Sequence, residues 1–249
     1  MKAKKLLAAL ISVLMVLMML PTAAFAEGDA PTRLIVGGTS VIEGTNVTYW
    51  LNDGNGGITK DNANESNYNV KYEPSEATLT LNGATITGSG NSSSEPYGAG
   101  IYARCNNGQS VALTIELIGN NNTITGYFGI YVNAEISADS NGTDASLTIT
   151  GENNGSLEVS GSYYGIYVKS GTGDASLNIN NASVKANTTS TYSSYAGIYV
   201  MSSAHATSSP NISLSVDGGS LTASGGESSD GIQFYVCLLY TSPSPRDCS

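Results

Sequence analysis

The chain has 249 residues, a formal net charge of −10, only 12% charged residues and 29 Gly. So acidic a chain is poorly suited to bind nucleic acid or an anionic membrane, and neither is expected as a partner. Three Cys are too few for a disulfide framework.

Residues 1–26 have the pattern of a secretory signal peptide. Three lysines (Lys2, Lys4 and Lys5) precede an apolar run over residues 6–20, and Ala24-Phe25-Ala26 is an A-x-A cleavage site. The run is short for a membrane span, which needs about 20 residues. We therefore expect export, a mature chain that begins near Glu27, and an extracellular location, secreted or at the cell surface.

Residues 27–76 contain strand-like runs but no repeat. The runs lie at residues 34–36, 46–51 and 68–72, and the segment holds the only Trp, Trp50. Because repeats follow directly, we expect this segment to form a β cap that covers the first of them.

Residues 77–236 are built from two recurring phrases. One reads G-I-Y or G-I-Y-V and begins at Gly100, Gly129, Gly165 and Gly197, with a degenerate G-I-Q-F at Gly231. The other reads L-T-L, L-T-I, L-N-I or L-S-V and begins at Leu79, Leu113, Leu147, Leu177 and Leu214. The Leu phrases are 34, 34, 30 and 37 residues apart. Self-similarity at such a period indicates a repeat architecture.

Each repeat carries three short runs that alternate between apolar and polar residues, as half-buried strands do. Turn-forming Gly, Asn, Asp and Ser separate the runs. We predict an all-β fold, a right-handed parallel β-helix of about five coils, in which each coil buries its Leu, Ile and Val on the next. An antiparallel sandwich is the alternative, but it needs hairpins and would not stack equivalent residues.

The last thirteen residues, 237–249, differ from the repeats. The segment CLLYTSPSPRD resembles one reading frame of a sequencing adapter, and the tail as a whole holds two of the three Cys. We expect this tail to be foreign and the solenoid to be truncated at its C-terminal end, whereas the alternative is a genuine C-terminus.

A family resemblance rests on R-L-I-V-G-G-T-S-V from Arg33, N-Y-N-V-K-Y-E-P from Asn67, A-T-L-T-L-N-G-A-T-I from Ala77, and the G-I-Y-V units. Over residues 32–236 the chain resembles exported repeat proteins of Gram-positive anaerobes. The resemblance implies a pectate-lyase-like β-helix and a carbohydrate-binding or adhesin-like role.

Stacking the repeats predicts columns of equivalent side chains. The outward polar columns are Thr80, Thr114, Thr148, Asn178 and Ser215 in the first strand, and Thr85, Thr123, Glu158, Ser183 and Thr222 in the second. The third strand predicts an outward aromatic column of Tyr102, Tyr131, Tyr167, Tyr199 and Phe234, flanked by Tyr164 among others. A sugar chain could lie along these rings, or the rings could simply stabilise neighbouring coils.

Carboxylates and bases are scattered over different columns of the repeats. Glycoside hydrolysis needs two carboxylates at a fixed separation, and lyases need a calcium site with a base. Residues 139–144 have partial EF-hand spacing, but Thr150 stands where a bidentate Glu is wanted. We expect neither catalytic residues nor a cofactor, with Ca²⁺ as the alternative.

The leading hypothesis is therefore a non-catalytic exported protein that binds polysaccharide or host glycan. One alternative is a structural stalk or adhesin that binds a host surface protein. Another is a polysaccharide lyase or hydrolase whose site lies beyond Val236.

Overall fold

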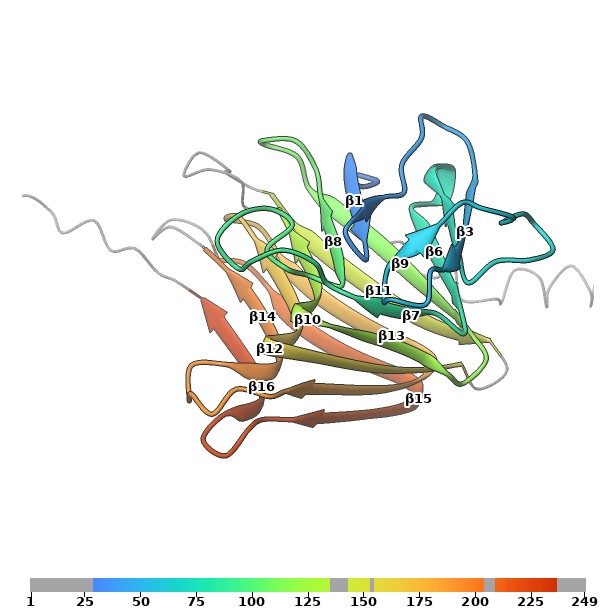
Figure 1. The fold of residues 1–249 in the computed structure, drawn as a ribbon. Helices are drawn as coiled ribbons and strands as arrows, with labels where there is room; N and C mark the ends of the chain where they lie inside the picture. Colours follow the sequence, from blue (N-terminus) through green and yellow to red (C-terminus); the bar gives the residue numbers. More distant parts are fainter. Residues whose placement is uncertain (1–28, 135–142, 153–154, 204–208, 237–249) are drawn as a thin grey trace, which may run out of the picture.

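The computed structural model describes residues 29–134, 143–152, 155–203 and 209–236, so the predicted signal peptide and tail lie outside the described residues. The fold is a parallel β-solenoid of about four turns, 60% strand and 2% helical, which confirms the predicted fold class although the repeats suggested about five coils (Figure 1). No helix in the described ranges is long and apolar enough to cross a membrane.

Three stacks of parallel strands form the walls of the solenoid. The first stack contains β6 (Thr78–Asn82), β9 (Val111–Ile118), β11 (Ala145–Glu152) and the first parts of β13 (Ala175–Thr188) and β15 (Ile212–Ser224). The second contains β7 (Thr85–Thr87), the first parts of β10 (Asn122–Asn133) and β12 (Ser156–Ser170), and the second parts of β13 and β15. The third contains β8 (Ile101–Arg104), the second parts of β10 and β12, β14 (Ala196–Ser202) and β16 (Asp230–Val236).

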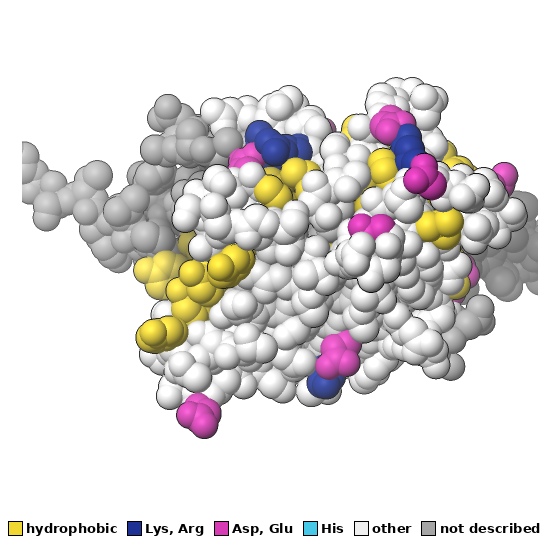
Figure 2. Space-filling model, viewed as in Figure 1, with side chains coloured by type: hydrophobic (Ala, Val, Ile, Leu, Met, Phe, Trp, Pro, Cys, Tyr) yellow, Lys and Arg dark blue, Asp and Glu magenta, His cyan; other side chains and the backbone are white. Residues whose placement is uncertain are grey.

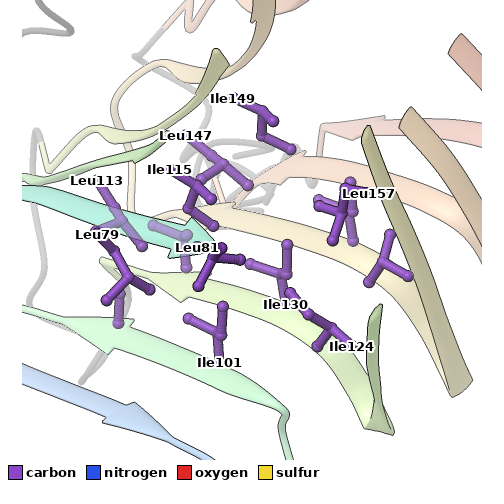
Figure 3. Packing of buried hydrophobic residues seen from close by; sticks show 14 of the residues in the cluster. Leu79, Leu81, Ile101, Leu113, Ile115, Ile124, Ile130, Leu147, Ile149 and Leu157 are labelled. Carbon is purple, nitrogen blue, oxygen red and sulfur yellow. The ribbon is translucent and has the colours of Figure 1, made fainter. Parts of the chain in front are cut away.

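The inward side chains of the stacks form one continuous apolar core. Leu113, Leu147 and Leu177 lie opposite one another in adjacent strands, and each is at most 1% exposed. Figure 3 shows such Leu and Ile side chains from several strands gathered in the same interior. Because alternation places every second residue inside, each repeat gains its stability from the row above and the row below.

The recurring glycine of the G-I-Y-V phrase is required because neighbouring atoms leave no room for a Cβ. A Cβ on Gly129 would lie 2.3 Å from Cγ2 of Val159 and 2.5 Å from the carbonyl oxygen of Gly165. The corner between the second and third stacks is therefore too narrow for any side chain at this position.

Another corner is fastened by polar side chains that bind the backbone of the next row. The Ser110 hydroxyl accepts a hydrogen bond from the N–H of Asp144 (2.9 Å). The Asp144 carboxylate accepts a hydrogen bond from the N–H of Asp174 (2.7 Å). In the next row, the Asp174 carboxylate accepts one from the N–H of Asn211 (2.7 Å). These contacts form a corner clamp that links successive rows where each first-stack strand begins.

The N-terminal strands pair antiparallel with one another and, through β1 and β5, with the first row of the solenoid. β1 (Arg33–Val36) pairs with β8 and with β2 (Thr39–Ser40), while β5 (Val70–Glu73) pairs with β6 and β3 (Thr48–Asn52). β4 (Ile58–Thr59) lies beside β3, and a 3₁₀ turn (Pro74–Glu76) leads into β6. Trp50 and Tyr72 of this cap are buried in the same core as the repeats.

The last row, β15 and β16, leaves its inward column exposed. Val216 is 45% exposed, although it lies opposite the fully buried Ile179. Phe234 is 54% exposed opposite the fully buried Val200. No strand of the described residues covers this row.

Each of the two predicted polar columns had one residue misplaced by two positions, and its other four members lie as predicted. Thr80 lies opposite Glu116 instead of Thr114, and Lys185 takes the place expected for Ser183 beside Glu158. A slip of two residues keeps the same side chains inside, so alternation alone cannot detect it.

Candidate functional site

The third stack brings four of the predicted site residues into one column. Tyr102, Tyr131, Tyr167 and Tyr199 lie directly opposite one another in successive strands. The ring centroids of Tyr131 and Tyr167 are 4.6 Å apart with nearly parallel planes (4°), and those of Tyr167 and Tyr199 are 5.3 Å apart. The strand spacing of about 4.8 Å thus holds the rings in a ladder.

Phe234 does not belong to this ladder. Gln233 lies opposite Tyr199, whereas Phe234 lies opposite Val200 and faces the inner column. The G-I-Q-F phrase has Gln in the position of Tyr, and since alternate residues face opposite sides, the next residue must point inward.

Tyr164 flanks the ladder as predicted. Its ring is stacked 4.8 Å from that of Tyr199, and its hydroxyl donates a hydrogen bond to the carbonyl oxygen of Ser194 (3.0 Å). Burial, and then the nearby hydroxyls of Tyr199 and Tyr195, raise the pKa of Tyr164. The phenol therefore stays neutral and can act as a hydrogen-bond donor.

The first rungs of the ladder are covered by residues 88–99, which we call the strap. Tyr97 of the strap contacts the rings of Tyr102 and Tyr131, with centroids 5.6 and 5.8 Å apart. Tyr102 is fully buried and Tyr131 is 7% exposed, so neither presents a free ring face to solvent. The predicted column is outside the main core but belongs to a second hydrophobic cluster.

One carboxylate ties the strap to the solenoid. Glu95 accepts from Arg33 (2.9 Å), Arg104 (3.1 Å) and the Tyr102 hydroxyl (3.0 Å). Two guanidinium groups on one partly buried carboxylate make stronger hydrogen bonds than neutral groups would. Burial, followed by the Glu95 charge, raises the pKa of Tyr102, which keeps this phenol a donor to Glu95.

Other tyrosines form a second row that solvent reaches. The Tyr127 and Tyr163 rings are 5.6 Å apart, and those of Tyr163 and Tyr195 are stacked at 4.6 Å. Tyr192 continues this row edge-on to Tyr195 (6.4 Å, 85°) and is 71% exposed. Together with Tyr164 and Tyr199 these residues form what we call the tyrosine patch: Tyr127, Tyr163, Tyr164, Tyr192, Tyr195 and Tyr199.

The turn that carries Tyr192 is held in place by hydrogen bonds. The Tyr192 N–H donates to the Ser190 hydroxyl (3.1 Å), and the Ser229 hydroxyl donates to the Tyr192 carbonyl oxygen (2.7 Å). Sequence reasoning missed Tyr192 because it lies between strand signals. The T-Y-S-S-Y run at residues 191–195, two tyrosines in a polar turn, was the available signal.

Rows of small polar side chains lie beside the tyrosine patch on the second stack. One outward column reads Thr87, Thr125, Ser160, Asn187 and Ser224, and another reads Thr85, Thr123, Glu158, Lys185 and Thr222. In Figure 2 the side chains on this face are mostly uncharged and polar, and hydrophobic side chains gather toward the end where β12 and β14 lie. A hollow of about 330 Å³ lies over the same stack, lined by Asn120, Asn121, Asn122, Thr123, Ser156, Leu157, Glu158, Ser183 and Lys185.

Two outward carboxylates of the first and second stacks each have one side-chain partner. The Glu116 carboxylate accepts from the Thr80 hydroxyl (2.8 Å), and Glu158 pairs with Lys185 (2.7 Å). Of the predicted calcium loop, residues 139–142 lie outside the described residues, and Asp144 serves the corner clamp. In the part of the chain that the structure describes, no three His, Cys, Asp or Glu side chains are grouped as metal ligands.

Comparisons with protein-family models, curated proteins and solved structures find no match for this chain.

Proposed function

We propose that this protein is an exported, non-catalytic β-solenoid, secreted or displayed at the cell surface, that binds polysaccharide or host glycan on the tyrosine patch. This role agrees with the carbohydrate-binding function implied by its resemblance to pectate-lyase-like repeat proteins. The observation that carries the proposal is Tyr192, whose ring is 71% exposed on a turn pinned by hydrogen bonds.

The ring geometry decides which tyrosines can contact a sugar. Stacked rings such as Tyr163 and Tyr195 cover each other's faces and offer edges and hydroxyls. Tyr192 meets Tyr195 only at right angles, which leaves an open face for the C–H groups of a pyranose ring. A pinned aromatic platform binds at a low entropy cost because few torsions remain to be fixed.

The neighbouring polar columns suit a polymer that carries many hydroxyl groups, such as a polysaccharide. Thr125, Ser160 and Asn187 repeat at the strand spacing of about 4.8 Å and can each donate and accept hydrogen bonds. A polar polymer could therefore be held at several points, each of them weak.

The buried tyrosines of the ladder favour a second, structural role for the rest of the aromatic column. Tyr131 and Tyr167 are stacked at 4.6 Å and are each less than 10% exposed, which suits stabilisation of a stalk or adhesin. Tyr131→Ser and Tyr167→Ser should therefore lower the melting temperature and leave glycan binding unchanged wherever the protein remains folded.

Retention on insoluble cellulose, xylan, chitin and mannan, together with a glycan array, tests the proposal. Tyr192→Ala should reduce retention at least tenfold without changing the melting temperature. Tyr68→Ala, which removes a partly exposed ring from the cap, is the matched control and should bind normally. Absence of retention on every glycan, by protein that is shown to be folded, would falsify the proposal.

A further inference from the structure

The hollow on the second stack spans three successive rows of the solenoid. Its walls come from β10, β12 and β13, and its volume of about 330 Å³ is at the lower end of the range for small-molecule sites. It therefore suits a single ring rather than an extended chain.

The floor of the hollow is rigid and already hydrogen-bonded. Asn122 is 1% exposed, and its side-chain oxygen accepts from the N–H of Ala84 (3.0 Å). Its amide N–H groups donate to the carbonyl oxygens of Ile118 (3.2 Å) and Ser156 (3.1 Å). This side chain consequently fixes the shape of the site and leaves recognition to the groups around it.

One acid and one base stand together at the wall. The Lys185 ammonium donates to Oε1 of Glu158 at 2.7 Å, and both side chains are more than half exposed (55% and 54%). The carboxylate keeps a second oxygen as acceptor, and the ammonium has two further protons to donate. Adjacent hydroxyls of a sugar can donate to the first group and accept from the second.

The charge balance selects against acidic sugars. Glu158 neutralises Lys185, and the chain as a whole carries a net charge of −10, so a uronate carboxylate would meet repulsion without a free cation. Asn120, Asn121 and Ser156 also line the hollow. Their amide and hydroxyl groups can form hydrogen bonds with the uncharged hydroxyl groups of a sugar.

We infer that this hollow binds one neutral pyranose unit, with the Glu158–Lys185 pair contacting adjacent hydroxyls and the two asparagine amides completing the site. The inference rests on the proposed glycan-binding function and adds to it a second contact point on the second stack, a few residues before the tyrosine patch in each row.

Two-dimensional NMR of the full chain tests this site. The ligands are the methyl glycosides of glucose, galactose, mannose and N-acetylglucosamine, with galacturonic acid as the charged competitor. At least one neutral glycoside should shift the side-chain amide signals of Asn120 and Asn121 saturably. Glu158→Gln and Lys185→Met should each weaken that binding at least tenfold. Thr222→Val, opposite Lys185 in the next row but outside the hollow, should leave it unchanged.

The outcomes separate this inference from the proposed function. Polysaccharide retention that depends on Tyr192, with no saturable shift at the hollow, overturns the inference and leaves the proposed function standing. Tighter binding of galacturonic acid, or full binding by both charge variants, also overturns it. Saturable neutral binding that both charge variants weaken supports the inference, whereas no retention and no shift overturn both proposals. Melting curves of the variants should match the parent chain, because both side chains are at the surface.

Discussion

The two ends of the solenoid contain the same inward columns in opposite environments. At the capped end, Leu79 and Ile101 are fully buried, and the cap strands β5 and β1 pair with the strands that carry them. At the other end, Val216 and Ile232 occupy equivalent inward positions and are 45% and 39% exposed. The residue types are alike, so the difference shows that burial here depends on a neighbouring row more than on the residue itself.

The largest effect on stability is expected from a matched pair of core substitutions, one in a covered row and one in the last row. Leu177 and Leu214 are opposite each other in adjacent rows, but Leu177 is fully buried and Leu214 is only partly buried. Leu177→Ala should cost about 3–4 kcal/mol, while Leu214→Ala should cost about 1 kcal/mol, since no cavity closed on all sides is left. Denaturant unfolding measures both, and equal losses would show that the last row is covered in solution.

Hydrogen exchange examines the same contrast without any substitution. Amides of β9 and β11 have paired strands on both sides and should exchange slowly. Those of β15 and β16 should exchange at least a hundredfold faster, because this row can open without disrupting the others. Uniform protection through Val236 would contradict this account.

Extending the tyrosine ladder should stabilise the exposed end. Gln233 is opposite Tyr199, the position that Tyr occupies in the preceding rows. Gln233→Tyr should add a stacked ring worth about 0.5–1 kcal/mol and raise the melting temperature slightly. Gln233→Leu, which adds apolar area without the stacking geometry, is the control; a greater gain from Leu would argue against stacking.

The smallest effect is expected from Tyr72 at the capped end. Its hydroxyl is buried and has no hydrogen-bond partner among the described residues, so Tyr72→Phe should change stability by less than about 1 kcal/mol at pH 7.

The same substitution should alter the response to alkaline pH. Burial raises the pKa of Tyr72 from its ordinary value of 10 to about 12. The unfolded chain therefore loses this proton near pH 10 while the folded chain keeps it, and stability falls as the pH rises from 10 to 12. Tyr72→Phe should lose less stability over that interval in pH-dependent melting. An identical alkaline loss in both proteins would refute the assignment.

The sequence was sufficient to predict the repeat, its three strands and, apart from Phe234, the inward and outward positions of the G-I-Y-V strands. Alternation has a period of two, so it identified Leu147 and Ile149 as core residues without fixing the register. Thr80 and Ser183 were each misplaced by two residues, because Val111–Ile118 is longer than the Leu phrase within it and because β13 runs without a break from Ala175 to Thr188, so that no turn marks the corner.

The candidate site was harder to predict because irregular segments decide which rings are exposed. The tyrosine column lies where the repeats indicate, but the strap, which is longer than the segments at the same corner in the later rows, contacts and buries Tyr102. Tyr192 is in a turn whose position depends on contacts with the next repeat, at Ser229. Neither contact has a periodic signal in the chain.

The corner clamp has a consequence for engineering. The segment that connects the end of each third-stack strand to the clamp residue of that row varies in length. It has five, ten, three and eight residues before Ser110, Asp144, Asp174 and Asn211, respectively. The strands that follow nevertheless begin in register, at Val111, Ala145, Ala175 and Ile212. Since the clamp sets the start of each strand, foreign peptides grafted at this corner should not propagate a shift into the walls. Grafts in consecutive rows would then be displayed as an array with a pitch of about 4.8 Å, which makes this edge a scaffold for multivalent presentation.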